Sequence, residues 1–156
     1  MNGQVKMGSP GNDSLRGTCM ESFGEQDTYE LGRQMGSLAL PGQMYLLDGD
    51  LGVGKTVFTK GFGKGLGVEE AINSPTFTIV QEYMDGRIPF YHFDVYRIAD
   101  EEEMEEIGYE EYFFGGGVCL IEWAQNISDL LPVDAIRITI EKDLDKGFDY
   151  RSIRVD

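Results

Sequence analysis

The sequence predicts a single α/β domain with a mainly parallel central sheet, antiparallel strands added to it, and flanking helices. Two short apolar segments, residues 44–47 and 118–121, are typical of strands that are buried on both faces. Segments with helical periodicity alternate with strands along the chain, as in other α/β proteins. With 156 residues, 41% of them hydrophobic, the chain is long enough for one core and too short for two.

The first 20 residues are rich in Gly, Ser, Asn and Asp and show almost no apolar periodicity. Such a segment cannot bury enough apolar surface to offset the entropy that it loses on ordering. We therefore expect residues 1–20 to form a flexible tail and residues 21–156 to form the folded domain.

The domain is expected to begin with a short amphipathic helix that Asp27 caps and that ends near Gly36 or Pro41. The first apolar strand follows and leads directly into a glycine-rich loop. Apolar residues then return at helical spacing from Lys55 and stop at Gly67, so the loop opens a second helix.

Residues 77–83 and 88–93 flank a turn that contains glycine, and they predict an antiparallel hairpin. Residues 100–113 alternate acidic and apolar side chains, which favours a surface helix that is broken or kinked at Gly108. Further elements are expected after the second apolar strand: a short helical piece to Leu131 and strands at residues 135–141 and 150–155.

The net charge of −15, from 28 acidic and 13 basic residues, makes the average surface repel phosphate backbones and anionic lipid. The acidic run at residues 100–106 is typical of a solvated face, and a surface for a basic partner protein is the alternative. Two cysteines are too few for a disulfide framework. The apolar segments are also far shorter than the roughly 20 residues of a membrane span, so we expect a cytoplasmic protein.

The strongest motif is the glycine-rich loop, where residues 49–56 match the pattern G-x-x-x-x-G-K-T at every fixed position. The glycines let backbone N–H groups approach phosphate oxygens, and the following helix directs its partial positive charge at the same anion. Lys55 is expected to neutralise the β- and γ-phosphates, and the Thr56 hydroxyl to bind magnesium. The expected nucleotide-binding residues of this loop are Gly49, Asp50, Leu51, Gly52, Val53, Gly54, Lys55 and Thr56. Because the sequence has no Asn-Lys-x-Asp motif for reading guanine, ATP is the expected nucleotide.

A loop of this kind needs a second anchor for magnesium, usually an acid at the end of a neighbouring apolar strand. Glu122 directly follows the second apolar strand, and an ordinary strand-end acid is the alternative. Beside it, Trp123 could stack over the nucleotide or a partner, or it could fill a gap between helix and sheet.

An acid, a base and three aromatic side chains lie close together at residues 91–97. Asp94 could orient an attacking water or hold magnesium through a water, and Arg97 could neutralise charge that develops on the γ-phosphate. A structural ion pair between Asp94 and Arg97 is equally consistent with the sequence. His92 is the only histidine, and it is more typical of a satisfied structural residue than of a metal ligand.

Ser74, Pro75 and Thr76 lie between the second helix and the hairpin. Nucleotide-binding proteins often have a segment that senses the γ-phosphate at this place, and Thr76 could reach the metal. A plain turn whose backbone is fixed by Pro75 explains the same residues.

Taken in order, these motifs resemble the TsaE family, the small P-loop ATPases of bacterial tRNA threonylcarbamoyladenosine biosynthesis. The resemblance runs from about Ser22 to the C-terminus, and its segments are residues 49–56, 74–77, 91–97, 108–113 and 121–123. Each later motif alone is weak, but the ordered set is specific. One departure is Ala124-Gln125, where family members commonly carry proline and an acid, and this change could alter the wall beside the metal.

The resemblance implies ATP binding and slow hydrolysis. It implies phosphate and metal contacts for Lys55 and Thr56, a magnesium-ligand role for Glu122, and a need for Asp94 in hydrolysis. It also implies a role for Trp123 near the site and a nucleotide contact for Thr28.

In that family the protein does not itself transfer the threonylcarbamoyl group, so the resemblance implies TsaB and TsaD as partners and only indirect contact with tRNA. An acidic surface agrees with this, because a direct RNA enzyme should carry positive charge along its groove. A P-loop small-molecule kinase is the alternative. It would need a second substrate pocket and usually a lid with catalytic arginines, and Arg97 is the only obvious basic candidate.

Overall fold

The structure, a computed structural model, describes residues 11–50, 52–75 and 78–156. The strands are β1 (Thr18–Ser22), β2 (Met44–Asp48), β3 (Val80–Tyr83), β4 (Phe90–Asp94), β5 (Val118–Glu122), β6 (Ile136–Lys142) and β7 (Arg151–Val155). The α-helices are α1 (Glu25–Leu38), α2 (Lys55–Gly65), α3 (Glu102–Glu106) and α4 (Tyr109–Phe113). Short 3-10 helices are η2 (Gly11–Leu15), η3 (Ala124–Leu130) and η4 (Leu144–Lys146).

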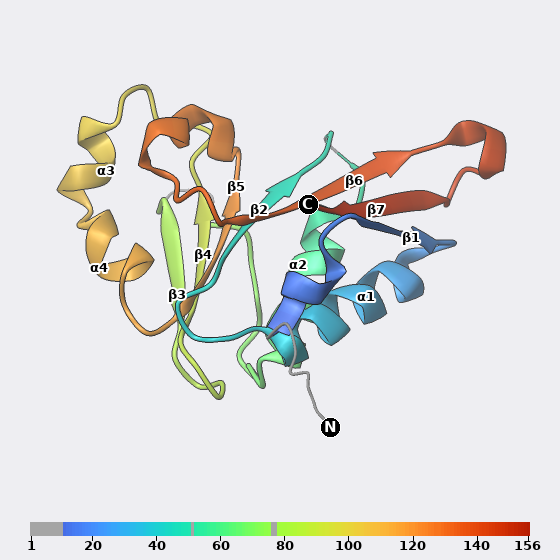
Figure 1. The fold of residues 1–156 in the computed structure, drawn as a ribbon, viewed down its shortest axis with the longest axis horizontal. Helices are drawn as coiled ribbons and strands as arrows, with labels where there is room; N and C mark the ends of the chain where they lie inside the picture. The colour runs from blue at the N-terminus through green and yellow to red at the C-terminus, as the bar shows by residue number, and fades with distance from the viewer. Residues whose placement is uncertain (1–10, 51, 76–77) are drawn as a thin grey trace.

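The seven strands among the described residues form one sheet in the order β1-β7-β6-β2-β5-β4-β3 (Figure 1). The four central strands, β6, β2, β5 and β4, run parallel to one another. On one side of this group, β3 pairs antiparallel with β4. On the other side, β7 pairs antiparallel with β6, and β1 pairs antiparallel with β7. The predicted fold class, a mainly parallel sheet with antiparallel additions, is therefore confirmed.

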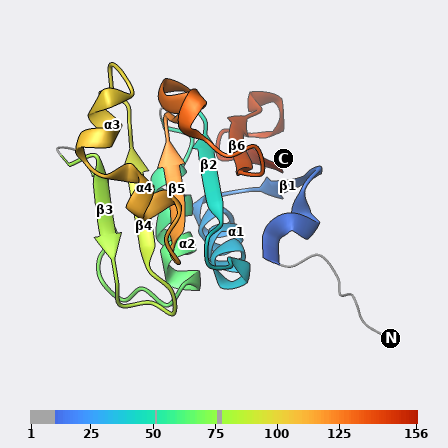
Figure 2. The same ribbon diagram turned by 60° about the vertical axis from the view of Figure 1, so that its left-hand side comes forward.

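The two faces of the sheet are covered by different helices (Figures 1 and 2). Successive side chains of a strand point to opposite faces, so an apolar run such as β2 supplies apolar side chains to both faces of the sheet. Tyr45 and Leu47 pack in the core that contains residues of α1 and α2, whereas Met44 and Leu46 pack in the core that contains residues of α3, α4 and η3. This explains why β2 and β5 lack an alternating polar pattern.

Glycines let α1 and α2 approach each other closely. A Cβ added to Gly36 of α1 would lie 2.0 Å from the Phe62 carbonyl oxygen, and one added to Gly61 of α2 would lie 2.1 Å from the Tyr29 carbonyl oxygen. Both contacts would be with backbone, which cannot move aside as a side chain can. The glycines are therefore required by helix packing, and they hold α1 beside the helix that follows the glycine-rich loop.

The prediction of a flexible tail over residues 1–20 was wrong for residues 11–20, and residues 1–10 lie outside the described part. Residues 11–15 form η2, and β1 pairs with β7 at the edge of the sheet. Asn12 is buried, and its Nδ2 donates to the Met35 carbonyl at 2.8 Å and to the Tyr45 hydroxyl at 2.7 Å. These partners lie far along the chain, so local composition did not indicate them.

Other elements differ from expectation mainly at their ends. Helix α1 begins at Glu25, and Asp27 lies inside its first turn, where the carboxylate accepts from the Phe23 amide at 3.0 Å. The expected capping role of Asp27 was therefore wrong. The break at Gly108 is confirmed, because this residue separates α3 from α4 with φ 71°. None of the helices in the described ranges is long and apolar enough to cross a membrane.

Candidate functional site

The glycine-rich loop joins the buried strand β2 to the N-terminus of α2, in the order that the motif requires. Gly52 and Gly54 have φ values of 82° and 107°, a region that side-chain-bearing residues rarely adopt. A Cβ added to Gly49 would lie 2.8 Å from the Ile140 carbonyl oxygen. The loop therefore requires glycine at both fixed positions. Leu51, which we expected to bind nucleotide, lies outside the described residues.

Two carboxylates lie at the carboxyl ends of neighbouring parallel strands. Asp94 ends β4 and Glu122 ends β5, and the two residues are paired across the strands. Leu47, near the end of β2, pairs with Glu122 on its other side. The sheet thus brings both acids to the edge from which the glycine-rich loop leaves, as expected for ligand-binding residues of such a sheet.

Glu122 lies between two basic side chains. Its Oε1 is 3.9 Å from the Lys55 Nζ, and its Oε2 is 2.7 Å from the His92 Nε2. The residue is only 8% exposed, and a buried carboxylate is tolerated when it is paired and hydrogen-bonded. Because a carboxylate accepts hydrogen bonds, the His92 Nε2 carries the hydrogen and donates. Sequence reasoning had not connected His92 with Glu122.

Trp123 has a backbone conformation that is uncommon outside glycine, with φ 64°. The Lys55 Nζ lies 4.9 Å from its ring centroid, within the range of a cation–π interaction, and the Tyr96 ring lies 4.8 Å away on centroids. The indole is half-buried. It therefore packs against a neighbouring ring and also covers the lysine of the loop.

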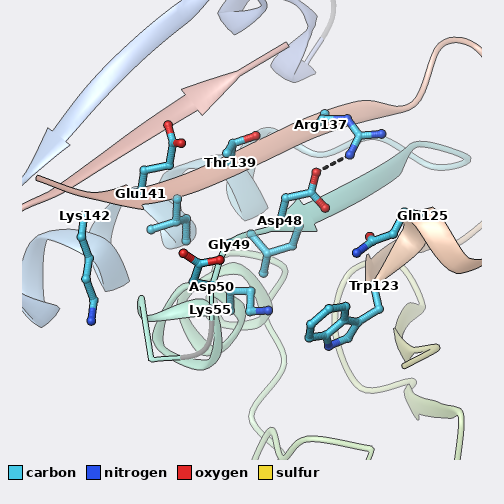
Figure 3. A pocket seen from close by; sticks show the side chains of 12 residues that line it. Asp48, Gly49, Asp50, Lys55, Trp123, Gln125, Arg137, Thr139, Glu141 and Lys142 are labelled. Atoms are coloured by element: carbon cyan, nitrogen blue, oxygen red, sulfur yellow. Dashed lines mark hydrogen bonds and ion pairs between the residues drawn. The ribbon is translucent and has the colours of Figure 1, made fainter. Parts of the chain in front are cut away.

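A cavity of about 510 Å³ opens beside Lys55 and Trp123 (Figure 3). Its lining residues are Leu47, Asp48, Gly49, Asp50, Lys55, Trp123, Gln125, Arg137, Thr139, Ile140, Glu141 and Lys142. Arg137 and Asp48 form an ion pair in its wall (Figure 3). Sequence reasoning missed the residues from β6, because no motif marks them and only the parallel pairing of β6 with β2 brings them to the loop. Gln125, part of the departure from the family pattern, lines this cavity.

Thr28 lies on the opposite side of the loop, where α1 approaches it. The residue is buried, its hydroxyl is 2.7 Å from the Ser22 hydroxyl, and its Cγ2 is 3.8 Å from the position that a Cβ on Gly54 would occupy. Thr28 and Gly54 line a small cleft with Arg151, whose Nε donates to the Val53 carbonyl at 2.9 Å. The first helix and the last strand thus both contribute residues beside the loop.

The other residues expected at the site are Asp94, Arg97, Ser74, Pro75 and Thr76. Asp94 accepts from the Tyr96 amide at 3.0 Å, and in the described ranges none of the ion pairs joins it to Arg97. The structural ion pair, one of the two alternatives for these residues, is therefore not formed here. Arg97 is exposed in the turn after β4. In the segment before β3, Ser74 is exposed and Pro75 is buried, while Thr76 lies outside the described residues.

Comparisons with known proteins match most of the chain to one family. Residues 23–152 match the family model for the threonylcarbamoyl adenosine biosynthesis protein TsaE. The chain is 48% identical to the tRNA threonylcarbamoyladenosine biosynthesis protein TsaE of Bacillus subtilis over 128 residues, which cover 82% of this chain and 78% of that protein. It is 44% identical to the protein of the same name from Treponema pallidum over 115 residues, 74% of this chain and 84% of that one.

A solved structure has a similar fold. The crystal structure of YdiB from Bacillus subtilis superposes with a TM-score of 0.70 at 40% identity, covering 87% of this chain and 82% of that chain. The matching family model spans most of the residues described above, including the glycine-rich loop and both strand-end acids. The chain therefore belongs to the TsaE family of threonylcarbamoyl adenosine biosynthesis proteins.

Proposed function

We propose that this chain is a magnesium-dependent ATPase that serves threonylcarbamoyladenosine modification of tRNA. The names of its TsaE relatives support the tRNA-modification role. The observation that carries the ATPase role is the position of Lys55, at the start of α2 and 3.9 Å from the strand-end acid Glu122. A phosphate-binding lysine and a carboxylate for the accompanying cation are the two groups that such a site needs.

The phosphates of ATP would be held by the loop and by the start of α2. Backbone N–H groups between Gly49 and Thr56 and the partial positive charge of the helix favour an anion there. The Lys55 ammonium group, which now faces Glu122 and Trp123, would turn to the β- and γ-phosphates. Thr28, beside Gly54, would contact the nucleotide from the side of α1.

The side chains beside Lys55 fit a magnesium ion. Magnesium is usually bound through one or two protein oxygen ligands together with substrate phosphates. The Glu122 carboxylate and the Thr56 hydroxyl are hard oxygen donors, and Thr56 lies in the first turn of α2. A bound magnesium ion would neutralise charge on the β- and γ-phosphate oxygens.

Hydrolysis requires an ordered water in line with the γ-phosphate. Asp94, paired with Glu122 across β4 and β5, would orient that water. Trp123 would shield the site from bulk solvent, and Arg97 would stabilise charge that develops on the γ-phosphate. The segment Ser74-Pro75-Thr76 would respond to the γ-phosphate. These four roles are proposals that variants can separate.

The proposed partners are the TsaB and TsaD proteins, which would contact tRNA while this chain contributes ATP turnover in the cytoplasm. The net charge of −15 supports an indirect role in tRNA binding, because an acidic protein has little electrostatic attraction to a phosphate backbone.

A small-molecule kinase is the second candidate, and the cavity beside Lys55 favours it. A phosphoryl acceptor needs its own pocket next to the γ-phosphate, and this cavity of about 510 Å³ includes the basic residues Arg137 and Lys142. Arg137 is already paired with Asp48, so less positive charge is free for an acidic acceptor.

The fate of the γ-phosphate separates the two candidates. We would follow γ-labelled ATP with the protein, magnesium and a metabolite extract, with and without TsaB, TsaD and tRNA. The ATPase proposal expects inorganic phosphate as the only labelled product. A labelled small molecule whose formation needs Lys55 would instead establish the kinase.

A further inference from the structure

His92 lies outside the proposed set of ligand-binding residues but contacts one of them directly. It lies in the middle of β4, is 2% exposed, and donates from Nε2 to the Glu122 carboxylate over 2.7 Å. Its other ring nitrogen, Nδ1, is buried and has no hydrogen-bond partner among the residues that the structure describes. The imidazole thus makes a single directed side-chain hydrogen bond there, and that bond ends on the proposed magnesium ligand.

From this arrangement, and resting on the proposed function of Glu122, we propose that His92 is a positioning residue for the Glu122 carboxylate. Glu122 has two oxygens, and His92 holds Oε2 from the interior of the sheet. Oε1 is thereby left facing the side where phosphate and magnesium would bind, 3.9 Å from the Lys55 Nζ. A hydrogen bond from a neighbour to a ligating carboxylate fixes its orientation and preserves metal affinity.

The hydrogen bond from His92 matters because the Lys55 ammonium group lies near the same carboxylate. At 3.9 Å the Lys55 ammonium group is at the outer limit of an ion pair and does not hold the carboxylate in one orientation. Without His92, the carboxylate can rotate toward Lys55 and form a direct ion pair in this poorly hydrated place. Such a pair would occupy the groups proposed for magnesium and for phosphate at the same time.

The imidazole is itself held rigidly. Its ring stacks nearly parallel to that of Phe90, with 6.3 Å between centroids and an interplanar angle of 8°. Residues 90 and 92 lie on the same face of β4, because side chains two apart on a strand point the same way. Phe90 belongs to the core shared with α2, so the donor is fixed by packing beneath the loop.

The test compares variants that differ in the donor at the position of Nε2. Glutamine in His92→Gln places an amide N–H near that position, whereas phenylalanine in His92→Phe fills the volume without a donor. Asparagine in His92→Asn is polar, but its amide lies at the position of Nδ1 instead. Asn12→Ala is the matched control, because it removes buried hydrogen bonds from η2, outside the candidate site.

The readout is the ratio of the dissociation constants of a non-hydrolysable ATP analogue measured in EDTA and in magnesium. This ratio reports how strongly magnesium binding is coupled to nucleotide binding, and it does not depend on turnover. We expect the ratio to fall by roughly 10-fold or more toward 1 in His92→Phe and His92→Asn, the size typical of a lost partner to a metal ligand. His92→Gln and Asn12→Ala should keep a ratio close to that of the wild type.

The outcomes are distinguishable. If Glu122→Gln lowers the ratio while His92→Phe and His92→Asn leave it unchanged, His92 does not position the ligand. If His92→Gln loses as much as His92→Phe, the role is packing and the inference is also overturned. If Glu122→Gln itself leaves the ratio unchanged, the proposed magnesium-ligand role of Glu122 fails first. Should His92→Phe fail to fold, His92→Asn against His92→Gln gives the same decision.

Discussion

Lys55 is the residue on which nucleotide binding should depend most. Its ammonium group is only about one-tenth exposed and lies between Glu122 and the Trp123 ring, so it is already poised at the loop. Each hydrogen bond to a charged group contributes about 1.5–3 kcal/mol, which corresponds to roughly 10- to 150-fold in affinity. We therefore expect Lys55→Ala to weaken ATP binding by at least about tenfold in titration calorimetry. An unchanged affinity would refute the assignment of the loop.

Asp94 should behave differently, because it is expected to act on water and not on the nucleotide. We predict that Asp94→Ala keeps the ATP affinity of the wild type and loses turnover by about 100-fold or more, as for a lost general base. Binding by calorimetry and single-turnover hydrolysis separate the two effects. Equal losses in both would assign Asp94 a structural role at the end of β4.

The two cysteines should differ in reactivity. Burial raises the pKa of the Cys119 thiol to about 12, whereas Cys19 is exposed on the edge strand β1. Since the thiolate is the reactive form, a raised pKa keeps Cys119 protonated and unreactive near neutral pH. Mass spectrometry after brief alkylation at mildly alkaline pH should find Cys19 modified and Cys119 unmodified. Labelling of both at similar rates in folded protein would contradict this burial.

Among the helices and strands, α1 and α2 pack closely against each other. Alanine normally stabilises a helix by about 0.5–1 kcal/mol over glycine. At Gly36, however, a Cβ would lie 2.0 Å from the Phe62 carbonyl oxygen, so Gly36→Ala should instead destabilise the protein by about 1–3 kcal/mol. Urea unfolding measures this, and Ser37→Ala on the exposed face of the same helix is the control. A stabilising Gly36→Ala would show that the helices are farther apart.

The elements that sequence analysis predicted well are those whose signals are local. The strand β2, the glycine loop and α2 follow from an apolar run, fixed glycines and helical spacing within about twenty residues. Strand β1 was missed because an edge strand of mixed composition is defined by its partner, and Thr18 pairs with Val155 at the other end of the chain. The helix start was misjudged by three residues, because the N-cap is Gly24 and not Asp27, and helix ends depend on local hydrogen bonds that composition does not resolve.

In the candidate site, too, residues with a local signal were predicted, and residues brought together by strand order were not. Lys55, Thr56 and Glu122 were indicated by a motif and by the end of an apolar strand. The bond from His92 to Glu122 and the wall formed by Arg137 arise from strand order, which places β4 beside β5 and β6 beside β2. Strand order is set by tertiary packing, so these contacts had no local signal.

At the scale of the whole molecule, charge separates direct from indirect action on tRNA. A protein with 28 acidic and 13 basic residues should repel a phosphate backbone. We predict that the chain alone does not retain tRNA in filter binding at physiological salt, with or without ATP. Retention that falls steeply as salt rises would contradict this and indicate a basic surface that contacts RNA directly.

We propose that this chain is a magnesium-dependent ATPase completed by partner proteins. ATP hydrolysis should be measured for the chain alone and with TsaB, TsaD and tRNA, in the wild type and in Glu122→Ala. We predict slow hydrolysis alone, stimulation by the partners, and loss of the stimulated rate in EDTA and in Glu122→Ala. Hydrolysis that the partners leave unchanged, or a stimulated rate that survives in Glu122→Ala, would contradict the account.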